Sequence, residues 1–139
     1  MSSLNRIESG RVGGRAQSPR FIQAQLQKLY DVIQENKSAI RKALAADGHK
    51  TTAEIELELH LALDSVKSQY DSINFEQEIK DEYKVVRGEN AKTRRVAHGI
   101  VYIQPAQHTL LYSIVSPLSA AIRAGNCVVV EVGCSPFRL

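Results

Sequence analysis

Hydrophobic side chains recur at helical spacing through the first third of the chain. They are separated by 4, 3, 4, 7 and 4 positions, which places them on one face of a helix. Ser18 and Pro19 precede them as an N-cap and a first-turn proline, and Gly48 follows as a C-terminal cap. The pattern predicts one long amphipathic helix, whose buried stripe is Ile22, Leu26, Leu29, Ile33, Ile40 and Leu44.

A second long helix is predicted to begin after Thr51. Thr51 and Glu54 have the spacing of a capping box, in which each side chain bonds to the backbone N–H of the other residue. The helix face opposite the apolar stripe is acidic. The stripe itself consists of Ile55, Leu59, Leu63, Val66, Tyr70 and Ile73. Residues 1–17 lack such periodicity and are rich in serine, glycine and arginine, so we expect a flexible tail before a single domain over residues 18–139.

The hydrophobic period changes after about residue 82. Residues 83–87 and 93–97 are short, β-rich and separated by a Gly-Glu-Asn turn, which predicts a β-hairpin. Residues 99–104 and 127–132 are further strand candidates, and residues 109–124 between them are an apolar helix candidate. Strand, helix and strand in this order predict a βαβ unit, and the continuous apolar character of the second strand suits a parallel sheet.

Composition narrows the class of protein. The 139 residues, 43% of them hydrophobic, suit one globular domain with its own core. No apolar run approaches the roughly 18 residues of a membrane span, and no apolar signal segment opens the chain. Two cysteines, Cys127 and Cys134, are too few for a disulfide framework. We therefore expect a cytoplasmic protein with reduced thiols and no membrane partner.

The net charge of +3 does not indicate a nucleic-acid partner. It arises in residues 1–20, because residues 21–139 hold fourteen basic and fourteen acidic side chains. Within that part, residues 52–82 are strongly acidic and residues 83–139 are basic. A nucleic-acid footprint is larger and lies on one side of the molecule. We expect no nucleic-acid partner.

The stretch from Gly99 to Val132 reads GIVYIQPAQHTLLYSIVSPLSAAIRAGNCVVVEV. It resembles the first βαβ unit of the aldehyde dehydrogenase superfamily, most closely in Pro117-Leu118 and in Ala124-Gly125-Asn126 before the second strand. The upstream helices fit the same resemblance, which extends over about residues 19–132. It implies the N-terminal part of an NAD-binding domain. The expected fold is thus α/β: two long N-terminal helices, a β-hairpin, and one βαβ unit of a truncated doubly wound, Rossmann-like sheet.

Two positions depart from the pattern that the resemblance implies. The family's Pro-Trp-Asn falls on Pro105-Ala106-Gln107, so the oxyanion-binding asparagine is replaced by a longer amide. Its Lys-Pro-Ser-Glu begins at Glu131, so an acid stands where a lysine would contact the cofactor ribose. The glycine-containing dinucleotide loop, the general base and the catalytic cysteine are expected beyond Leu139. We therefore expect no working NAD-dependent dehydrogenase and no cofactor.

Titratable groups nevertheless gather where an open α/β sheet binds ligands, at the carboxyl ends of its strands. His108 and Gln107 follow the first strand and Glu131 follows the second, so His108 and Glu131 could act as an acid–base pair, with Gln107 donating a hydrogen bond. Tyr102 and Tyr112 are candidates to line a substrate site there. The alternative is a solvated turn histidine, an unrelated carboxylate and ordinary core or rim tyrosines. No metal site is predicted.

Three classes of function stay open at this point. The first is a cofactor-independent isomerase, cyclase or lyase acting on a small organic ligand through His108, Glu131 and Gln107. The second is a non-catalytic module that binds or regulates another protein, and the third is a degenerate, inactive fragment. A sheet shortened by truncation would leave strand edges unpaired, so we expect a homodimer or higher oligomer, or else a protein partner at that edge.

Overall fold

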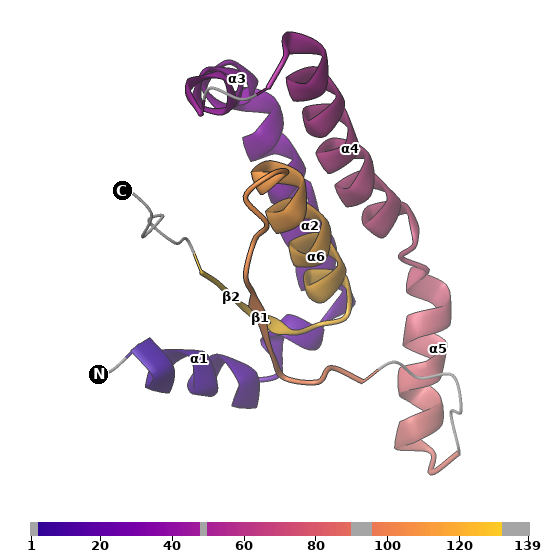
Figure 1. Ribbon diagram of the computed structural model, residues 1–139. Coiled ribbons are helices and arrows are strands. Elements are labelled where there is room, and N and C mark those ends of the chain that lie inside the picture. The colour runs from indigo at the N-terminus through magenta and orange to yellow at the C-terminus, as the bar shows by residue number, and fades with distance from the viewer. Residues whose placement is uncertain (1–2, 48–49, 90–95, 132–139) are drawn as a thin grey trace.

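The computed structural model describes residues 3–47, 50–89 and 96–131. The described residues form an α/β arrangement of helices with a two-stranded parallel sheet (Figure 1). In chain order the elements are α1 (Ser3–Val12), the 3-10 helix η1 (Arg15–Gln17), α2 (Pro19–Glu35), α3 (Lys37–Ala46), α4 (Thr52–Asp71), α5 (Phe75–Val86), β1 (Ile100–Ile103), α6 (Leu110–Arg123) and β2 (Cys127–Val130).

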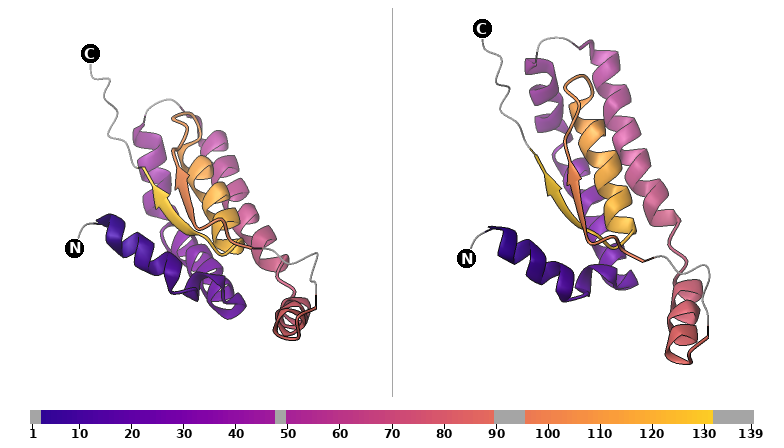
Figure 2. Two further views of the ribbon diagram at one scale, coloured as in Figure 1. Left: turned by 90° about the horizontal axis from the view of Figure 1, so that it is seen from below. Right: turned by 60° about the horizontal axis from the view of Figure 1, so that its bottom comes forward.

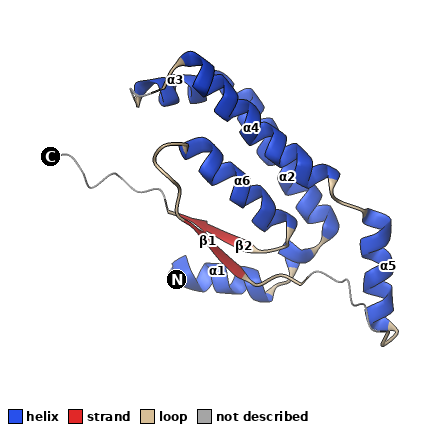
Figure 3. Cartoon of the chain, turned by 45° about the vertical axis from the view of Figure 1, so that its right-hand side comes forward, coloured by secondary structure: helices blue, strands red, loops and turns tan. Residues whose placement is uncertain are grey.

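The hydrophobic core lies between three helices. Helix α6 lies between the α2–α4 layer and the sheet, and α1 lies on the other side of the sheet (Figure 3). The buried stripes of α2 and α4 meet α6 as their spacing predicts. The buried members of this core are Ile22, Leu26, Ile33, Leu59, Ala62, Leu63, Val66 and Val115.

The predicted βαβ unit is confirmed. β1 pairs with β2 in parallel, with Ile100 opposite Cys127 and Ile103 opposite Val130. Asn126 sets the start of this pairing, because its side-chain oxygen accepts the Gly99 N–H at 2.9 Å. Gly99 has a φ of +113°, and a Cβ there would lie 2.9 Å from the Cδ of Arg11. Only glycine adopts this backbone conformation readily and leaves room for the Arg11 side chain.

The first predicted helix is two helices in the structure. α2 and α3 are separated at Asn36, whose side-chain amide donates to the Val32 carbonyl at 2.8 Å. An asparagine side chain that bonds to the backbone competes with helix continuation, so a break here is physically reasonable. The stripe contains its longest interval, from Ile33 to Ile40, at the same place. Gly48, the predicted cap, lies outside the described residues.

The second predicted helix start is confirmed. Thr51 accepts the Glu54 N–H, and the Glu54 carboxylate accepts the Thr51 N–H at 2.6 Å, so both halves of the capping box form. The Thr51 backbone N–H and the Thr51 hydroxyl both donate to the Glu54 carboxylate, and these two hydrogen bonds lower the pKa of Glu54 below its usual value.

The predicted β-hairpin is wrong in its first half, because residues 83–86 are the last turn of α5. Asn74 caps this helix by accepting the Gln77 N–H at 3.1 Å, and Glu76 forms an i,i+4 ion pair with Lys80 at 2.7 Å. These local interactions outweigh the strand preference of the tyrosine and valines at its end. Residues 96 and 97 of the second predicted hairpin strand form no strand, and residues 93–95 lie outside the described part.

The N-terminal segment contains a helix that its pattern did not predict. Helix α1 lies beside β2 (Figure 2). A Cβ at Gly10 would be 3.7 Å from Cys127 Sγ. Flexibility of residues 1–17 stays a prediction. None of the helices in the described ranges combines the length and apolarity that a bilayer crossing requires.

Candidate functional site

The carboxyl ends of the two strands lie side by side. The Glu131 N–H, just after β2, donates to the Ile103 carbonyl at the end of β1 at 2.9 Å. The turn that leaves β1 is fixed by Ser113 of α6, whose hydroxyl accepts the Ala106 N–H at 3.0 Å. The backbone therefore brings the predicted residues after both strands to one edge of the sheet.

Tyr102 and Glu131 form the polar contact of this edge. The Tyr102 hydroxyl donates a hydrogen bond to the Glu131 carboxylate. This bond, reinforced by partial desolvation and by the negative charge, raises the pKa of Tyr102 above its usual value. The pair is open to solvent, since Tyr102 is 60% exposed. Both residues are predicted from the sequence to lie at this edge, but their pairing is not.

The structure does not bring His108 and Glu131 into contact. Both are exposed, and within the described residues no hydrogen bond or ion pair joins them. The Glu131 carboxylate is instead engaged by Tyr102. Gln107 is also exposed, on the same turn as His108. The catalytic roles assigned to these three residues stay predictions.

Tyr112 lies at the first turn of α6 beside a buried carboxylate. Its N–H donates to Glu58 Oε1 at 3.2 Å, and the other Glu58 oxygen pairs with the Lys50 ammonium. Glu58 is 5% exposed, so this charge is both desolvated and paired. It sits at the positive end of the α6 dipole, which favours an anion. Tyr112 is thus placed by a contact that anchors α6 on α4.

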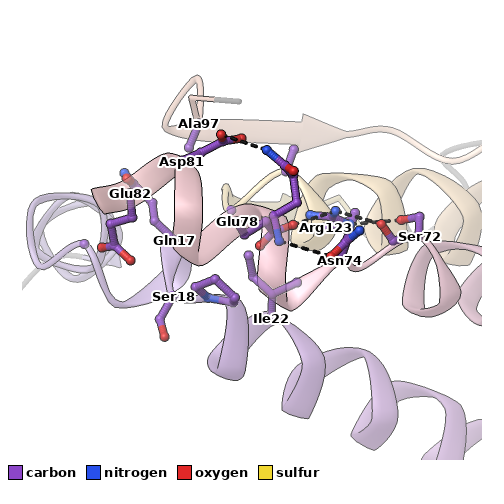
Figure 4. Close-up of a pocket in the computed structure, with 15 residues that line it drawn as sticks. Gln17, Ser18, Ile22, Ser72, Asn74, Glu78, Asp81, Glu82, Ala97 and Arg123 are labelled. Atoms are coloured by element: carbon purple, nitrogen blue, oxygen red, sulfur yellow. Dashed lines mark hydrogen bonds and ion pairs between the residues drawn. The ribbon is translucent and has the colours of Figure 1, made fainter. Parts of the chain in front are cut away.

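A cleft lies elsewhere, between α5, the η1–α2 junction and the end of α6 (Figure 4). Its volume is about 700 Å³. Arg123 lies at its base with 8% exposure. Its guanidinium pairs with Glu78 at 2.7 Å and donates to the hydroxyl and the carbonyl of Ser72 at 2.9 and 3.1 Å. Arg123 therefore joins the end of α6 to Ser72 and to Glu78 of α5.

The α5 side of that cleft carries three acidic residues, Glu78, Asp81 and Glu82. Asp81 is nearly buried and accepts from the Gln77 amide at 2.9 Å. A second cleft, of about 380 Å³, lies between α2 and α4 and is lined by Tyr30 and Tyr70 among others. Neither cleft is lined by the predicted site residues. The sequence signal for the first was an arginine in an otherwise apolar helix.

No trio of histidine, cysteine, aspartate and glutamate side chains clusters as metal ligands within residues 3–47, 50–89 and 96–131. The end of β2 does not fit the NAD contact that the resemblance implies. The side chain there is the carboxylate of Glu131, held by Tyr102, and it would repel an anionic dinucleotide.

Comparison with known proteins agrees with this βαβ arrangement. The model of the aldehyde dehydrogenase family matches residues 14–133. The chain belongs to the aldehyde dehydrogenase family, as the residues around Pro117 and Asn126 suggested.

Individual relatives are aldehyde dehydrogenase family 3 members. The chain is 32% identical to member B1 of Bos taurus over 93% of its length, 34% identical to member B1 of Rattus norvegicus over 92%, and 33% identical to member B1 of Homo sapiens over 93%. In each case the aligned part is 28% of the relative, so the chain spans little more than a quarter of these proteins. No solved structure matches the chain significantly.

Proposed function

We propose that this aldehyde-dehydrogenase-like chain has no dehydrogenase activity of its own and acts as an association module that pairs with a second copy of itself. The observation that carries the proposal is the apolar outer face of the two-stranded sheet. Ile100 and Tyr102 are 47% and 60% exposed there, although they belong to a strand whose next residue, Ile103, is buried.

The register defines which residues share this outer face. Parallel partners point to the same side of a sheet, so Ile100, Tyr102, Cys127 and Val129 lie together on the face away from α6. Helix α1 approaches this face at Cys127, where Gly10 faces the sulfur. The Ile100–Tyr102 half of the face is open, and exposed apolar surface on a strand favours association.

The edge of β1 offers backbone hydrogen bonds as well. Gly99 and Ile103 use their carbonyl groups to accept from the residues of β2 and the position after it. Because successive residues of a strand point their backbone groups to opposite sides, those of Ile100 and Tyr102 point away from β2. A second β1, antiparallel about a two-fold axis, would pair with them and extend a sheet. We also propose that, within one chain, the βαβ unit is part of a doubly wound, Rossmann-like arrangement.

Light scattering on a chromatographic peak tests this function. Wild type should have twice the chain mass of 15.4 kDa, and Ile100→Lys should have the mass of one chain, because a lysine on the edge strand opposes pairing. Val32→Lys is the matched control, since Val32 is 55% exposed on α2, far from the sheet in the chain, and should leave the dimer intact. A monomeric wild type at micromolar concentration removes the proposal.

A second candidate is a cofactor-independent isomerase, cyclase or lyase. The Tyr102–Glu131 pair and the exposed His108 and Gln107 lie at the carboxyl ends of both strands, where this kind of fold binds ligands. Histidine exchanges protons near neutral pH, and positioned acid–base groups supply 10²–10⁴-fold in rate. Any turnover found in a panel of small carbonyl and enol substrates should fall about that much in His108→Ala. The exposed His60 on α4 provides the control, His60→Ala, and equal losses in both variants would dismiss this candidate.

A further inference from the structure

Helix α1 touches the sheet at two points where a glycine leaves room for a close approach. Gly10 of α1 faces Cys127 at the start of β2, and a Cβ added to Gly10 would lie 3.7 Å from the Cys127 sulfur. The stem of Arg11 lies against Gly99, just before β1, where an added Cβ would be 2.9 Å from Arg11 Cδ. α1 thus rests on the side of the sheet opposite α6, as Figure 3 shows.

This contact buries little of α1. Among the α1 side chains that the structure describes, Ile7 is half-buried, Val12 is 76% exposed and none is buried. A helix of ten residues is marginal in water when it stands alone, and Gly10 in its interior weakens it further. The helix therefore depends on the sheet for its structure, and few interactions hold it in the docked position.

The segment after α1 combines a hinge with a fixed base. Gly13 and Gly14 separate α1 from η1, and Gly14 has a φ of +63°, a left-handed conformation that glycine adopts without strain. In contrast, η1 is held against the turn between α6 and β2, because a Cβ at Gly125 would lie 3.2 Å from Gln17 Cα. α1 can therefore swing about the two glycines while η1 and α2 stay in place.

The docked helix covers the β2 half of the outer face of the sheet. All four residues of β2 are half-buried, whereas Ile100 and Tyr102 of β1 are exposed. The parallel register places Cys127 beside Ile100 on this face, and Gly10 lies over the Cys127 sulfur. With α1 lifted, the Cys127 half and the open β1 half would form one continuous apolar face.

We propose that α1 is a displaceable strap. Docked, it shields the Cys127 end of the outer face, and lifted about Gly13 and Gly14, it exposes that end. The strap itself does not depend on self-association. Its consequence rests on the proposed function: lifting α1 enlarges the apolar face open to further copies of the chain, so the docked strap limits association beyond a dimer.

The accessibility of Cys127 to a fluorescent maleimide tests the strap. The full chain carries Cys134→Ser throughout, so that Cys127 is the only thiol. Gly10→Lys should speed labelling about tenfold or more, because a long side chain does not fit where a Cβ alone already contacts the sulfur. Gly10→Ala should slow labelling about two- to fivefold, because its methyl group fits at 3.7 Å and alanine favours the helix.

Val12→Lys is the matched control. It introduces the same side chain into the same helix, but two positions on, about 200° around the helix axis, at a residue that is 76% exposed. It should label within about twofold of wild type. Equal rates for Gly10→Lys and Val12→Lys overturn the strap, as does wild-type labelling as fast as that of the chain unfolded in urea. If Gly10→Lys loses helical circular dichroism beyond the ten residues of α1, Arg11→Ala replaces it, and its labelling should also be faster than that of wild type.

Light scattering on the same proteins tests the consequence for association. Gly10→Lys should have a larger mass than wild type at equal concentration, and Val12→Lys should not. Equal masses of the two lysine variants overturn the limit that the strap sets on association. A monomeric wild type whose labelling still responds to Gly10→Lys and Gly10→Ala removes the proposed self-association and leaves the strap standing, so the two failures are distinguishable.

Discussion

At the scale of single residues, Tyr102 and Glu131 show how a substituted position acquires a new contact. The resemblance implies a lysine at position 131, and a lysine ammonium could not accept a hydrogen bond from the Tyr102 hydroxyl. The carboxylate can, and it stabilises the neutral phenol relative to the phenolate. The substitution therefore replaces a cofactor contact with a tyrosine–carboxylate hydrogen bond at this edge of the sheet.

Glu131→Gln should lower the pKa of Tyr102 toward its usual value, because the amide still accepts a hydrogen bond but carries no charge. Phenolate absorbance during an alkaline titration measures this, and subtraction of the Tyr102→Phe curve isolates Tyr102 from the other tyrosines. The pH at which Tyr102 ionises should be lower in Glu131→Gln than in wild type. Superimposable Tyr102 titrations would mean that Glu131 does not control this group.

At the scale of elements, the sequence was sufficient wherever local chemistry and packing agree. Thr51 and Glu54 identify the start of α4. The apolar spacing of β1, α6 and β2 identifies the βαβ unit, in which Pro117 lies inside α6. The hairpin was misassigned because Val85 and Val86 favour strands in isolation. Their helix depends on the Asn74 cap and on side-chain pairs one turn apart.

The candidate site could be predicted in the same way, where the local sequence determines a position but not where tertiary packing does. The positions of residues 102 and 131 follow from the strand ends, so their neighbourhood could be predicted. Their pairing depends on how the strands align, and the absence of a His108–Glu131 contact depends on the path of the turn after β1, neither of which a pattern specifies. The cleft at Arg123 could not be predicted, because one of its walls is α5, and the last turn of that helix had been predicted to be a hairpin strand.

The capping box makes a prediction for α4. Thr51→Ala should lower the free energy of unfolding by about 1 kcal/mol, since the first-turn N–H groups lose their acceptor. Thr52→Ala changes the same side chain at a position without a capping bond and should have little effect. Urea denaturation of the two variants measures the difference, and equal midpoints would show that the cap contributes nothing.

The Glu54 half of the box adds a dependence on pH. Its pKa is lower in the folded protein than in the unfolded chain, so the contribution is present above the usual glutamate pKa of about 4.3. It is lost as the pH falls through the lower, folded-state value. Thr51→Ala keeps the backbone N–H that donates to Glu54, so Glu54→Ala is the variant that removes this contribution. The gap in stability between wild type and Glu54→Ala should therefore narrow in acid, whereas a gap that widens in acid would contradict this sign.

At the scale of the whole molecule, stability and exposed surface are unevenly distributed. Helices α2, α4 and α6 share one core, while the sheet has two strands and α5 presents its apolar side to solvent. A two-stranded sheet alone is marginal in water, so β1 and β2 depend on α6 beneath them. The outer face of β1, which is assigned to association, and the exposed apolar stripe of α5, formed by Ile79, Tyr83 and Val86, both lie outside the three-helix core. They can therefore be altered without removing the interactions that fold the chain.

That separation predicts opposite outcomes for core and surface substitutions. Leu26 is fully buried among the three core helices, so Leu26→Ala should lower the free energy of unfolding by about 2–5 kcal/mol through lost burial and the cavity left behind. Tyr83→Ala removes a larger side chain from the α5 stripe, but that side chain is mostly exposed, and the change should stay within about 0.5 kcal/mol. Urea denaturation followed by both circular dichroism and tyrosine fluorescence measures the two free energies and tests whether the chain unfolds in one step. A Tyr83→Ala loss as large as that of Leu26→Ala would mean that the α5 stripe belongs to the core of the folded protein.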